Sequence, residues 1–363
     1  MRNLTAQLQC AKSQQTEMNQ LPDSHQTIQT PSWARRKVIN LRRVTMKTTG
    51  LALSAIAVAA ILCVTASAQV KLTYSQARMA HPDWVQIPGE LIRPDCVHEI
   101  PNGAMIETGS DGQPTGDVSL NGVRIAHYDA CPEAPIVTRT FGSQADLEHD
   151  PGTQNGWVEG SQWLVSLGSG DNVDLQDGFW TVPTNPLDNG ALIYLFNGIE
   201  PGDFSAILQP VLQYGSNGAF GGNYWVIASW YVGPSGFHSG PETVNPGDEL
   251  FGYTQITGDS GGTLSWKVDA QDKTTGAFSY ITLQNSGEQW TWALAGILEV
   301  YSVSSCNQLP SDKKVAFTKS YAYHGYPEYD KLEPAEWSAM YWKNTGPACK
   351  YSVTAGTTST LHW

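Results

Sequence analysis

The stretch "GALIYLFNGIEPGDFSAILQPVLQYG", residues 190–215, contains two apolar runs separated by a turn with Pro and Gly. Each run has the length and the boundaries that are typical of a buried β-strand. The second run carries Gln209 inside "AILQPVL". A buried amide needs hydrogen-bond partners, so Gln209 is either a structural hydrogen-bonding residue or a working group of a site.

Five more stretches have the same strand-like character. In "TLSWKVDAQD", Leu264, Trp266 and Val268 alternate with polar residues, which predicts a half-buried strand with one wet face. Seven strands at this spacing predict an all-β fold, an antiparallel β-sandwich that is concanavalin-like in layout. The other four stretches are "NYWVIASWYVG" (223–233), "DELFGYTQIT" (248–257), "FSYITLQNS" (278–286) and "WTWALAGILEVYSV" (290–303).

The N-terminal part of the chain predicts export. "MKTTGLALSAIAVAAILCVTASAQ" places a basic residue, an apolar run and "ASA" in the order of a signal peptide, residues 46–68, with cleavage after Ala68. The alternative is a transmembrane anchor, which the shortness of the apolar run disfavours. Residues 1–45 are polar and basic, and we expect them to be a disordered upstream extension.

The remaining chain divides into three parts. We expect an N-terminal accessory segment or propeptide over residues 69–140, the sandwich over 141–310, and a C-terminal segment packed on it over 311–363. Within the last part, "PAEWSAMYW" (334–342) predicts a short helix and "TTSTLHW" (357–363) a final strand. We expect a secreted, extracellular monomer without stable membrane insertion.

Four cysteines remain after residue 68, which suggests two disulfides in an oxidising compartment. Sequence order favours Cys96–Cys131 and Cys306–Cys349 among three possible pairings. The chain has no CxxC or HExxH motif, so we expect no metal and no cofactor.

The net charge of the chain excludes some classes of binding partner. Residues 69–363 carry 13 Lys and Arg against 32 Asp and Glu, a net charge of −19. Such a surface repels nucleic acid and anionic membranes, so no nucleic-acid partner is expected. It also suits an acidic medium, in which carboxylates are protonated.

A first catalytic candidate is "GDSGG" (258–262), which matches the nucleophile loop of trypsin-like serine peptidases. That chemistry also needs a histidine base and a buried aspartate in the same site. "IAHYDAC", around His127, is the nearest approach to the usual histidine context, and the usual preceding Cys is absent. A glycine-rich hairpin turn explains the motif better.

A second candidate rests on family resemblance. "LFNGIEPGDFSAILQ" resembles a segment of the eqolisins, the acid glutamic peptidases, in which "WVGID" is followed by "ILQ". Phe196 stands where that family has Trp, Glu200 where it has Asp, and Gln209 where it has its catalytic Gln. The resemblance continues over about residues 157–303, through "FWTVP" (179–183), "YWVIASWYVG" (224–233), "VNPGDELFGY" (244–253) and "ALAGILEVYSV" (293–303).

The last of these strands departs from the family pattern. The family carries its catalytic Glu early in the strand and a second acid four residues later, whereas this strand has one acid, Glu299. If Glu299 matches the second acid, Ala295 occupies the catalytic position. Two-residue periodicity places positions 295 and 299 on one face, so Glu299 is the candidate base in a shifted register, or else a structural relic.

The chemistry explains why such a pair is needed. Hydrolysis of a peptide without metal or nucleophile requires a base that activates water and a donor for the developing oxyanion. The resemblance implies Glu299 for the first role and the amide of Gln209 for the second, with Glu200, Phe196, Trp230 and Trp292 supporting or lining the site. The implied substrate is a polypeptide.

Aromatic residues within the strands support a different hypothesis. On a concave face they could stack on sugar rings of an extracellular glycan, which would make the protein a non-enzymatic binding module. Tryptophan in a β-sandwich is more often part of the core. The residues concerned are Trp225, Trp230, Tyr231, Trp266, Trp290 and Trp292.

The signal peptide yields a direct prediction. The exported protein should begin at or near Gln69, because small residues precede it at the positions that signal peptidases require. N-terminal sequencing of the protein recovered from the medium tests this, and a mature start upstream of Met46 would contradict it.

Overall fold

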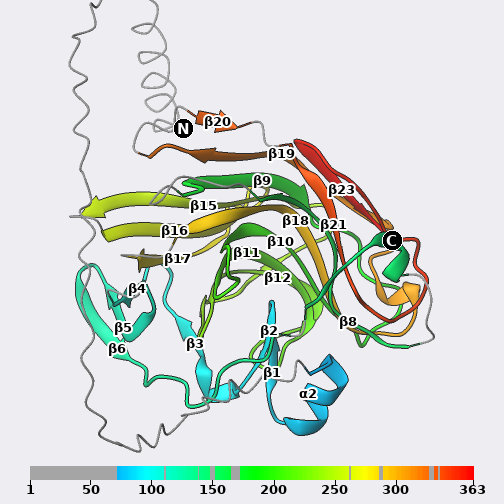
Figure 1. Ribbon diagram of the computed structural model, residues 1–363, viewed down its shortest axis with the longest axis horizontal. Coiled ribbons are helices and arrows are strands. Elements are labelled where there is room, and N and C mark those ends of the chain that lie inside the picture. The colour runs from blue at the N-terminus through cyan, green and yellow to red at the C-terminus, as the bar shows by residue number, and fades with distance from the viewer. Residues whose placement is uncertain are drawn as a thin grey trace, which may run out of the picture. The chain divides into compact units, whose positions relative to one another are not determined.

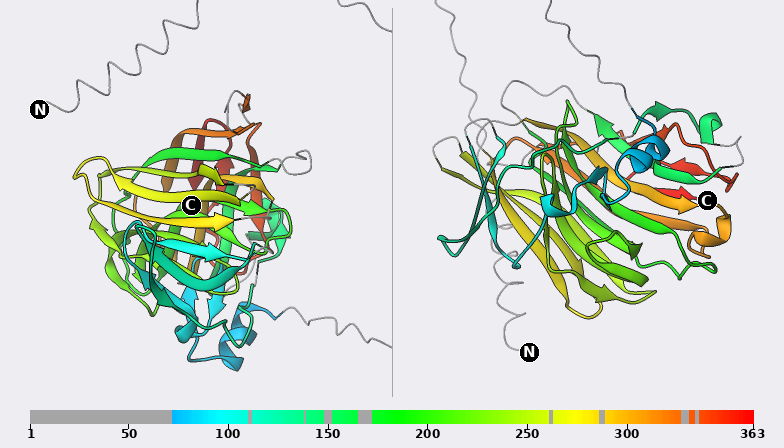
Figure 2. Two further views of the ribbon diagram at one scale, coloured as in Figure 1. Left: turned by 90° about the vertical axis from the view of Figure 1, so that its left-hand side faces the viewer. Right: turned by 90° about the horizontal axis from the view of Figure 1, so that it is seen from below.

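The computed structural model describes residues 72–109, 112–137, 139–147, 152–164, 172–260, 263–285, 289–326, 331–333 and 336–363 of the 363-residue chain. Two large sheets stack face to face and confirm the predicted β-sandwich (Figures 1 and 2). The predicted signal peptide and upstream extension lie outside the described residues. Among the described helices, none is long and apolar enough to span a membrane.

The first sheet, sheet I, contains both candidate residues of the predicted catalytic pair. Its strands are, in spatial order, β3 (Val97–Ile100), β13 (Gly236–Ser239), β12 (Gly221–Val232), β11 (Ile207–Ser216), β10 (Leu192–Pro201), β18 (Trp290–Val303), β8 (Gln154–Leu164), β21 (Ser338–Trp342) and β7 (Phe141–Gly142), and β14 (Glu242–Val244) pairs with β12.

The second sheet, sheet II, covers one face of sheet I. Its strands are, in spatial order, β22 (Ser352–Thr354), β23 (Thr358–His362), β19 (Lys314–His324), β9 (Leu175–Thr181), β15 (Glu249–Ser260), β16 (Thr263–Asp272), β17 (Phe278–Asn285), β4 (Met105–Thr108), β5 (Pro114–Leu120) and β6 (Val123–His127), and β20 (Lys331–Glu333) pairs with β19.

A small N-terminal unit packs on the other face of sheet I, which we call the hairpin face. It consists of helix α2 (Tyr74–Ala80) and the two-stranded hairpin of β1 (Val85–Ile87) and β2 (Glu90–Ile92). Figure 1 shows this unit on the side of β10, β11 and β12 away from β9 and β15. Single 3-10 turns occupy Pro94–Cys96, Gln144–Leu147 and Cys306–Gln308.

Burial on both faces is the distinctive feature of the central strands. Every residue of β10 and all but Ser216 of β11 are buried. Leu195 and Leu212 pack between the sheets, whereas Phe196 and Val211 pack on the hairpin face. The continuous apolar runs in residues 190–215 therefore reflect a sheet that is covered on both sides.

All seven predicted strands exist, as β10, β11, β12, β15, β16, β17 and β18. The helix predicted over residues 334–342 is wrong, because Ser338–Trp342 forms β21. Met340 and Trp342 are buried there with Tyr341 partly exposed between them, a two-residue alternation. Trp342 packs edge-on against Trp157, with 4.8 Å between the ring centroids, so a tertiary contact decides the local structure.

A β-bulge in β18 determines which side chains reach the hairpin face. Phe196 of β10 pairs with Ile297 and Gly198 with Leu294, so β18 carries one extra residue between these pairs. Ala295 consequently packs between the sheets, while Leu294 and Ile297 lie on the hairpin face. The expectation that positions 295 and 299 share a face is therefore wrong.

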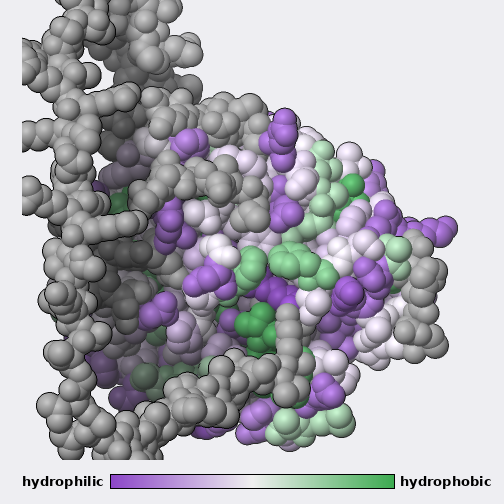
Figure 3. Space-filling model, viewed as in Figure 1, coloured by the Kyte–Doolittle hydropathy of each residue, from purple (hydrophilic) through white to green (hydrophobic). Residues whose placement is uncertain are grey.

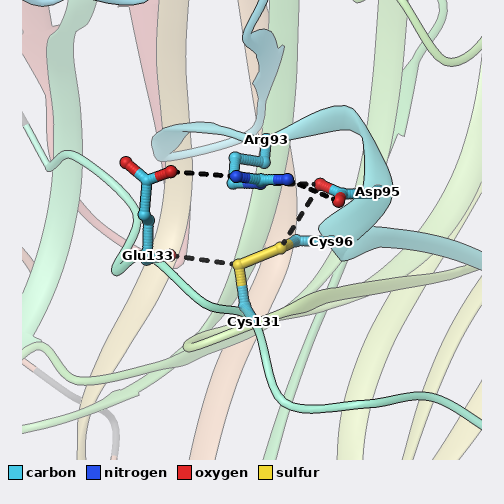
Figure 4. Close-up of a disulfide and its surroundings, with 5 residues drawn as sticks. All are labelled: Arg93, Asp95, Cys96, Cys131 and Glu133. Carbon is cyan, nitrogen blue, oxygen red and sulfur yellow. Dashed lines mark hydrogen bonds and ion pairs between the residues drawn. A yellow bond between two sulfur atoms is a disulfide. The ribbon is translucent and has the colours of Figure 1, made fainter.

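Both expected disulfides form. Cys96–Cys131 and Cys306–Cys349 have Cα–Cα distances of 5.5 Å each. The first lies beside a surface ion pair of Arg93 with Asp95 and Glu133 (Figure 4). The second joins the turn that follows β18 to the C-terminal segment.

The Cys306–Cys349 disulfide should contribute substantially to stability. It closes a loop across 43 residues of sequence separation, and a loop of this size is expected to stabilise by about 4 kcal/mol through the unfolded state. We expect the C306S/C349S double variant to unfold at lower urea concentration with a lower extrapolated free energy of unfolding. An unchanged midpoint and slope would contradict this expectation.

Candidate functional site

The β1–β2 hairpin brings its turn against the hairpin face of sheet I. Ile87 pairs with Glu90 across Pro88–Gly89, and Gly89 has φ +91°. Proline followed by a residue with positive φ matches a type II turn. Ile87 and Ile92 are fully buried among the side chains of sheet I, so apolar packing holds the hairpin in place.

Gln209 and Glu299 meet at one peptide group in this turn. The Nε2 of Gln209 donates to the carbonyl oxygen of Pro88 at 3.4 Å. The amide of Gly89 donates to the Glu299 carboxyl group, at 2.8 Å from Oε1 and 3.0 Å from Oε2. The carbonyl of Pro88 and the N–H of Gly89 belong to the same peptide group, so the two side chains hold its two ends.

The sheet register explains how distant sequence positions come together. Strands β11 and β18 both pair with β10, and Gly198 of β10 pairs with Leu294. A Cβ atom at Gly198 would lie 2.4 Å from the carbonyl oxygen of Leu208 and 3.1 Å from the Cβ of Gln209, so glycine is required beside the amide side chain. The Pro88–Gly89 turn bridges the strand between the two residues.

The carboxyl group of Glu299 is completely buried. The hydroxyl of Tyr301, two residues further along the same face, donates to its Oε1 atom. Burial raises the pKa of Glu299 to about 8, although the Tyr301 hydroxyl, the Gly89 amide and the charge of Arg139 favour the ionised form. In this arrangement Glu299 is therefore neutral over most of the physiological range.

Glu200 has a different partner. It is fully buried at the end of β10, and its Oε1 accepts a hydrogen bond from the guanidinium of Arg139. Arg139 also lies over the ring of Trp157, 4.4 Å from its centroid. Burial raises the pKa of Glu200, and Arg139 opposes the shift. Glu200 thus forms a buried ion pair with Arg139.

A third carboxyl group completes the cluster. Burial raises the pKa of Glu90, on β2 of the hairpin, to about 8, with Arg139 again opposing the shift. Glu200 raises the pKa of both Glu90 and Glu299, Glu299 raises the pKa of Glu90, and the charge of Arg139 acts on all three. One cation cannot neutralise three buried carboxylates, so protons must reside on this cluster.

The aromatic residues are packed rather than exposed. The ring centroids of Phe196 and Trp157 lie 5.3 Å apart, and those of Trp230 and His238 lie 4.5 Å apart. The Nε1 of Trp292 donates a hydrogen bond to Gln162. Phe196, Trp230 and Trp292 pack on the hairpin face, whereas the other four residues proposed for sugar stacking pack between the sheets. All six candidates for sugar stacking are at most 1% exposed: Trp225, Trp230, Tyr231, Trp266, Trp290 and Trp292.

The other motifs do not form a second centre. In the "GDSGG" stretch, β15 ends at Ser260 and β16 begins at Thr263, paired as a hairpin. His127 pairs with Asp117 at 2.5 Å on β5 and β6, which β4, β17 and β16 separate from β15 in the sheet. Within the described ranges no cluster of three or more His, Cys, Asp or Glu side chains could hold a metal ion.

Four functional positions escaped the sequence analysis. Tyr301 carried a usable signal, because it lies two residues after Glu299 in a strand. "IPGE" (87–90) signalled a tight turn, but nothing in it indicated the contact with the two candidate residues. Arg139 and Glu90 gave no local signal, because their partners are remote in sequence.

Comparison with known proteins gives a distant structural resemblance. The chain is similar to a crystal structure of scytalido-glutamic peptidase with a peptide-based transition state analogue, at 17% identity and a TM-score of 0.40. It is also similar to SCP-B, a member of the eqolisin family of peptidases in complex with the tripeptide Ala-Ile-His, at 18% identity and a TM-score of 0.39. Each covers 58% of this chain and 100% of the other.

A further structural match is the CBM2 module of the Lactobacillus casei BL23 phage J-1 evolved Dit, at 13% identity and a TM-score of 0.25, over 57% of this chain and 100% of the other. No family model matches the sequence, and no curated protein does so either. The resemblance to eqolisin structures is thus distant.

The Arg139–Glu200 pair yields a prediction on stability. Arg139→Met should destabilise the protein by about 3–5 kcal/mol at neutral pH, because it leaves Glu200 buried without its partner. The pKa of Glu200 is already raised and should rise further in the variant. A carboxyl group whose pKa is higher in the folded than in the unfolded state lowers stability once the pH exceeds its unfolded-state pKa. The loss of stability in the variant should therefore grow with pH and shrink in acid.

Urea unfolding of R139M at several pH values checks this prediction. The matched control is R139M/E200Q, which has no acid at position 200 and should show a smaller deficit and a weaker dependence on pH. Equal deficits in the single and double variants would contradict the ion-pair account.

Proposed function

We propose that this protein is a secreted endopeptidase that hydrolyses peptide bonds with water, using Gln209 and Glu299. The observation that carries the proposal is the Pro88–Gly89 peptide group, whose carbonyl oxygen contacts Gln209 and whose nitrogen contacts Glu299. A substrate peptide in the same position would present its carbonyl to the amide and its leaving nitrogen to the carboxyl group.

In the proposed chemistry Glu299 accepts a proton and later returns it, while Gln209 donates a hydrogen bond. Ionised Glu299 takes a proton from water, and the resulting hydroxide adds to the carbonyl carbon. The amide of Gln209 donates to the oxygen as it becomes an oxyanion, and a neutral amide can do so at any pH. Protonated Glu299 then gives its proton to the leaving nitrogen, so water is divided between the two products.

Tyr301 is a positioning residue in this proposal. Its hydroxyl donates to Oε1 of Glu299, which fixes the orientation of the carboxyl group and favours its ionised form. Arg139 and Glu200 hold the end of β10 beside it. The contact at 3.4 Å between Gln209 and Pro88 is long, which is common for donors that engage fully only when the oxygen becomes charged.

Glycan binding, the alternative function, receives less support. The aromatic rings that would stack on sugars are at most 1% exposed, so none presents a face to solvent in this structure. A polypeptide is therefore the proposed substrate class.

Substitution of the pair tests the proposal. Gln209→Ala should reduce turnover of a denatured protein substrate by about 10²–10³-fold, the loss that removal of one oxyanion donor causes. Glu299→Gln should abolish turnover, because an amide cannot accept the proton. Initial rates measured between pH 2 and 9 check both, with circular dichroism melting to confirm that each variant folds.

Gln213→Ala is the matched control, since Gln213 is a second buried glutamine on the same face of β11, bonded to the carbonyls of Gly215 and Phe220. It should retain turnover. The absence of hydrolysis in wild type and in all variants over the whole pH range would refute the proposal, and full activity of Glu299→Gln would assign the base elsewhere.

The pH profile gives an independent check on Glu299. In the substrate-free protein, with the hairpin docked, burial raises its pKa to about 8, and the base form is depleted below that value. We therefore expect kcat/KM, which reports the free protein, to rise with pH up to about 8. A kcat/KM that is already at its maximum in acid would contradict this assignment.

A further inference from the structure

The proposed active site is already occupied by the chain itself. Gln209 and Glu299 both form hydrogen bonds with the Pro88–Gly89 peptide group. Gln209 and Glu299 are fully buried beneath it. A substrate cannot reach either side chain while the turn remains in place.

From this occupancy we infer that the β1–β2 hairpin is a tethered pseudosubstrate, which closes the site and must withdraw before a polypeptide can enter. The inference rests on the proposed function, since it assigns a regulatory role at the same pair of residues. It concerns a segment that stays attached to the fold, as the following contacts show.

The hairpin is docked by contacts that do not involve the catalytic pair. The hydroxyl of Tyr194 donates to the backbone carbonyl of Gln86 at 2.7 Å, and the backbone N–H of Gln86 donates to the backbone carbonyl of Asn217 at 3.2 Å. Leu91 and Ile136 exchange two backbone hydrogen bonds, at 3.1 and 2.8 Å. The turn is thus presented to the site by anchors on both of its strands.

Beyond the hairpin the chain is fastened to the sandwich. The disulfide Cys96–Cys131 follows within a few residues of Ile92, and β3 then pairs in parallel with β13 of sheet I. A withdrawn hairpin would therefore remain close to the site and could compete with substrate at a high effective concentration. The device is reversible as long as the chain between β2 and β3 is intact.

The turn is open on its outer side at Gly89. A Cβ atom added at Gly89 would meet no atom within 4 Å. A cavity of about 540 Å³ borders the base of the hairpin, lined in part by Trp84, Val85 and Tyr301. In Figure 3, apolar and hydrophilic side chains lie next to each other at the centre of the visible face, without one continuous apolar area over it.

Ionisation favours the closed state in acid. The groups that face Glu299 are Tyr301 on its own strand, Tyr194 and Glu200 on β10, Tyr74 on α2, Glu90 on β2, and Arg139 before β7. Burial under the hairpin raises the carboxyl pKa of both Glu299 and Glu90 to about 8. When the hairpin withdraws, water would reach both carboxyl groups and lower their pKa values. The closed state therefore binds more protons than the open state, and it loses stability relative to the open state as pH rises from about 4.5 through 8.

The variant Gly89→Pro tests the inference. Proline removes the N–H that reaches Glu299 and cannot adopt the positive φ of Gly89, so the turn should leave the site. Gly122→Pro is the matched control, because Gly122 is also a turn glycine with positive φ, between β5 and β6, and its added Cβ would likewise meet nothing. Gly89→Ala is a milder second variant that keeps the N–H and strains only φ.

The measurements are turnover of a denatured protein at pH 6 and binding of a fluorescent synthetic peptide, acetyl-VQIPGELI-amide, which reproduces residues 85–92. Gly89→Pro should bind this peptide and hydrolyse substrate about tenfold or more faster than wild type, the factor expected if about 1.4 kcal/mol of closure is removed. Wild type and Gly122→Pro should bind little peptide. The difference in peptide binding between Gly89→Pro and wild type should narrow towards pH 8.

Binding also separates the inference from the proposed function. One outcome is that Gly89→Pro binds the peptide, that adding Gln209→Ala weakens this binding, and that no variant hydrolyses substrate. This outcome would uphold the hairpin as the ligand of the site and refute the peptidase. Hydrolysis at equal rates in wild type, Gly89→Pro and Gly89→Ala, without gain of peptide binding, would overturn the pseudosubstrate and leave the peptidase standing.

Discussion

A sheet that is apolar on both faces must be covered on both faces, and the rest of this structure depends on that constraint. Strands β10 and β11 expose almost nothing. Sheet II covers one face, and the N-terminal unit covers the other with Ile87 and Ile92 among its buried side chains. Burying each such side chain contributes about 1.5–3 kcal/mol. The hairpin is thus part of the core and also occupies the proposed site. When it withdraws, the disulfide Cys96–Cys131 and the pairing of β3 with β13 must stay in place.

The same cover determines the chemistry of the polar groups beneath it. A buried amide or carboxyl group needs a partner, and water cannot supply one under a docked hairpin. Gln209 and Glu299 find theirs in the backbone of the turn, and Glu200 finds its own in Arg139. The price of this arrangement is protonation of the carboxyl cluster, so cover, hydrogen bonding and ionisation change together when the hairpin moves.

Local pattern was sufficient for much of the fold. The seven central strands follow from apolar runs and turn residues, and both disulfides follow from the order of the cysteines. The helix expected over residues 334–342 failed because Trp342 packs against Trp157, a contact that no local pattern contains. Gln209 could be singled out because an amide in an apolar run is conspicuous. Its partner in the turn could not, because the contact spans 121 residues of sequence.

The bulge in β18 shows why a carboxylate position cannot be assigned from strand periodicity alone. One extra residue reverses the facing of every position on its N-terminal side relative to those that follow. Ala295 therefore faces the inter-sheet core, and Leu294 occupies the hairpin-face position that pairs with Gly198 of β10. Gly296 makes the bulge possible, because a Cβ atom there would lie 2.3 Å from the ring of Phe317. With a carboxyl group absent at that position, Glu299 reaches the peptide group from further along the strand, and the turn of the hairpin spans the distance to Gln209. The proposed catalytic arrangement therefore depends on where a bound backbone lies, and a substrate that binds in an extended form would have to place its peptide group where Pro88–Gly89 lies now.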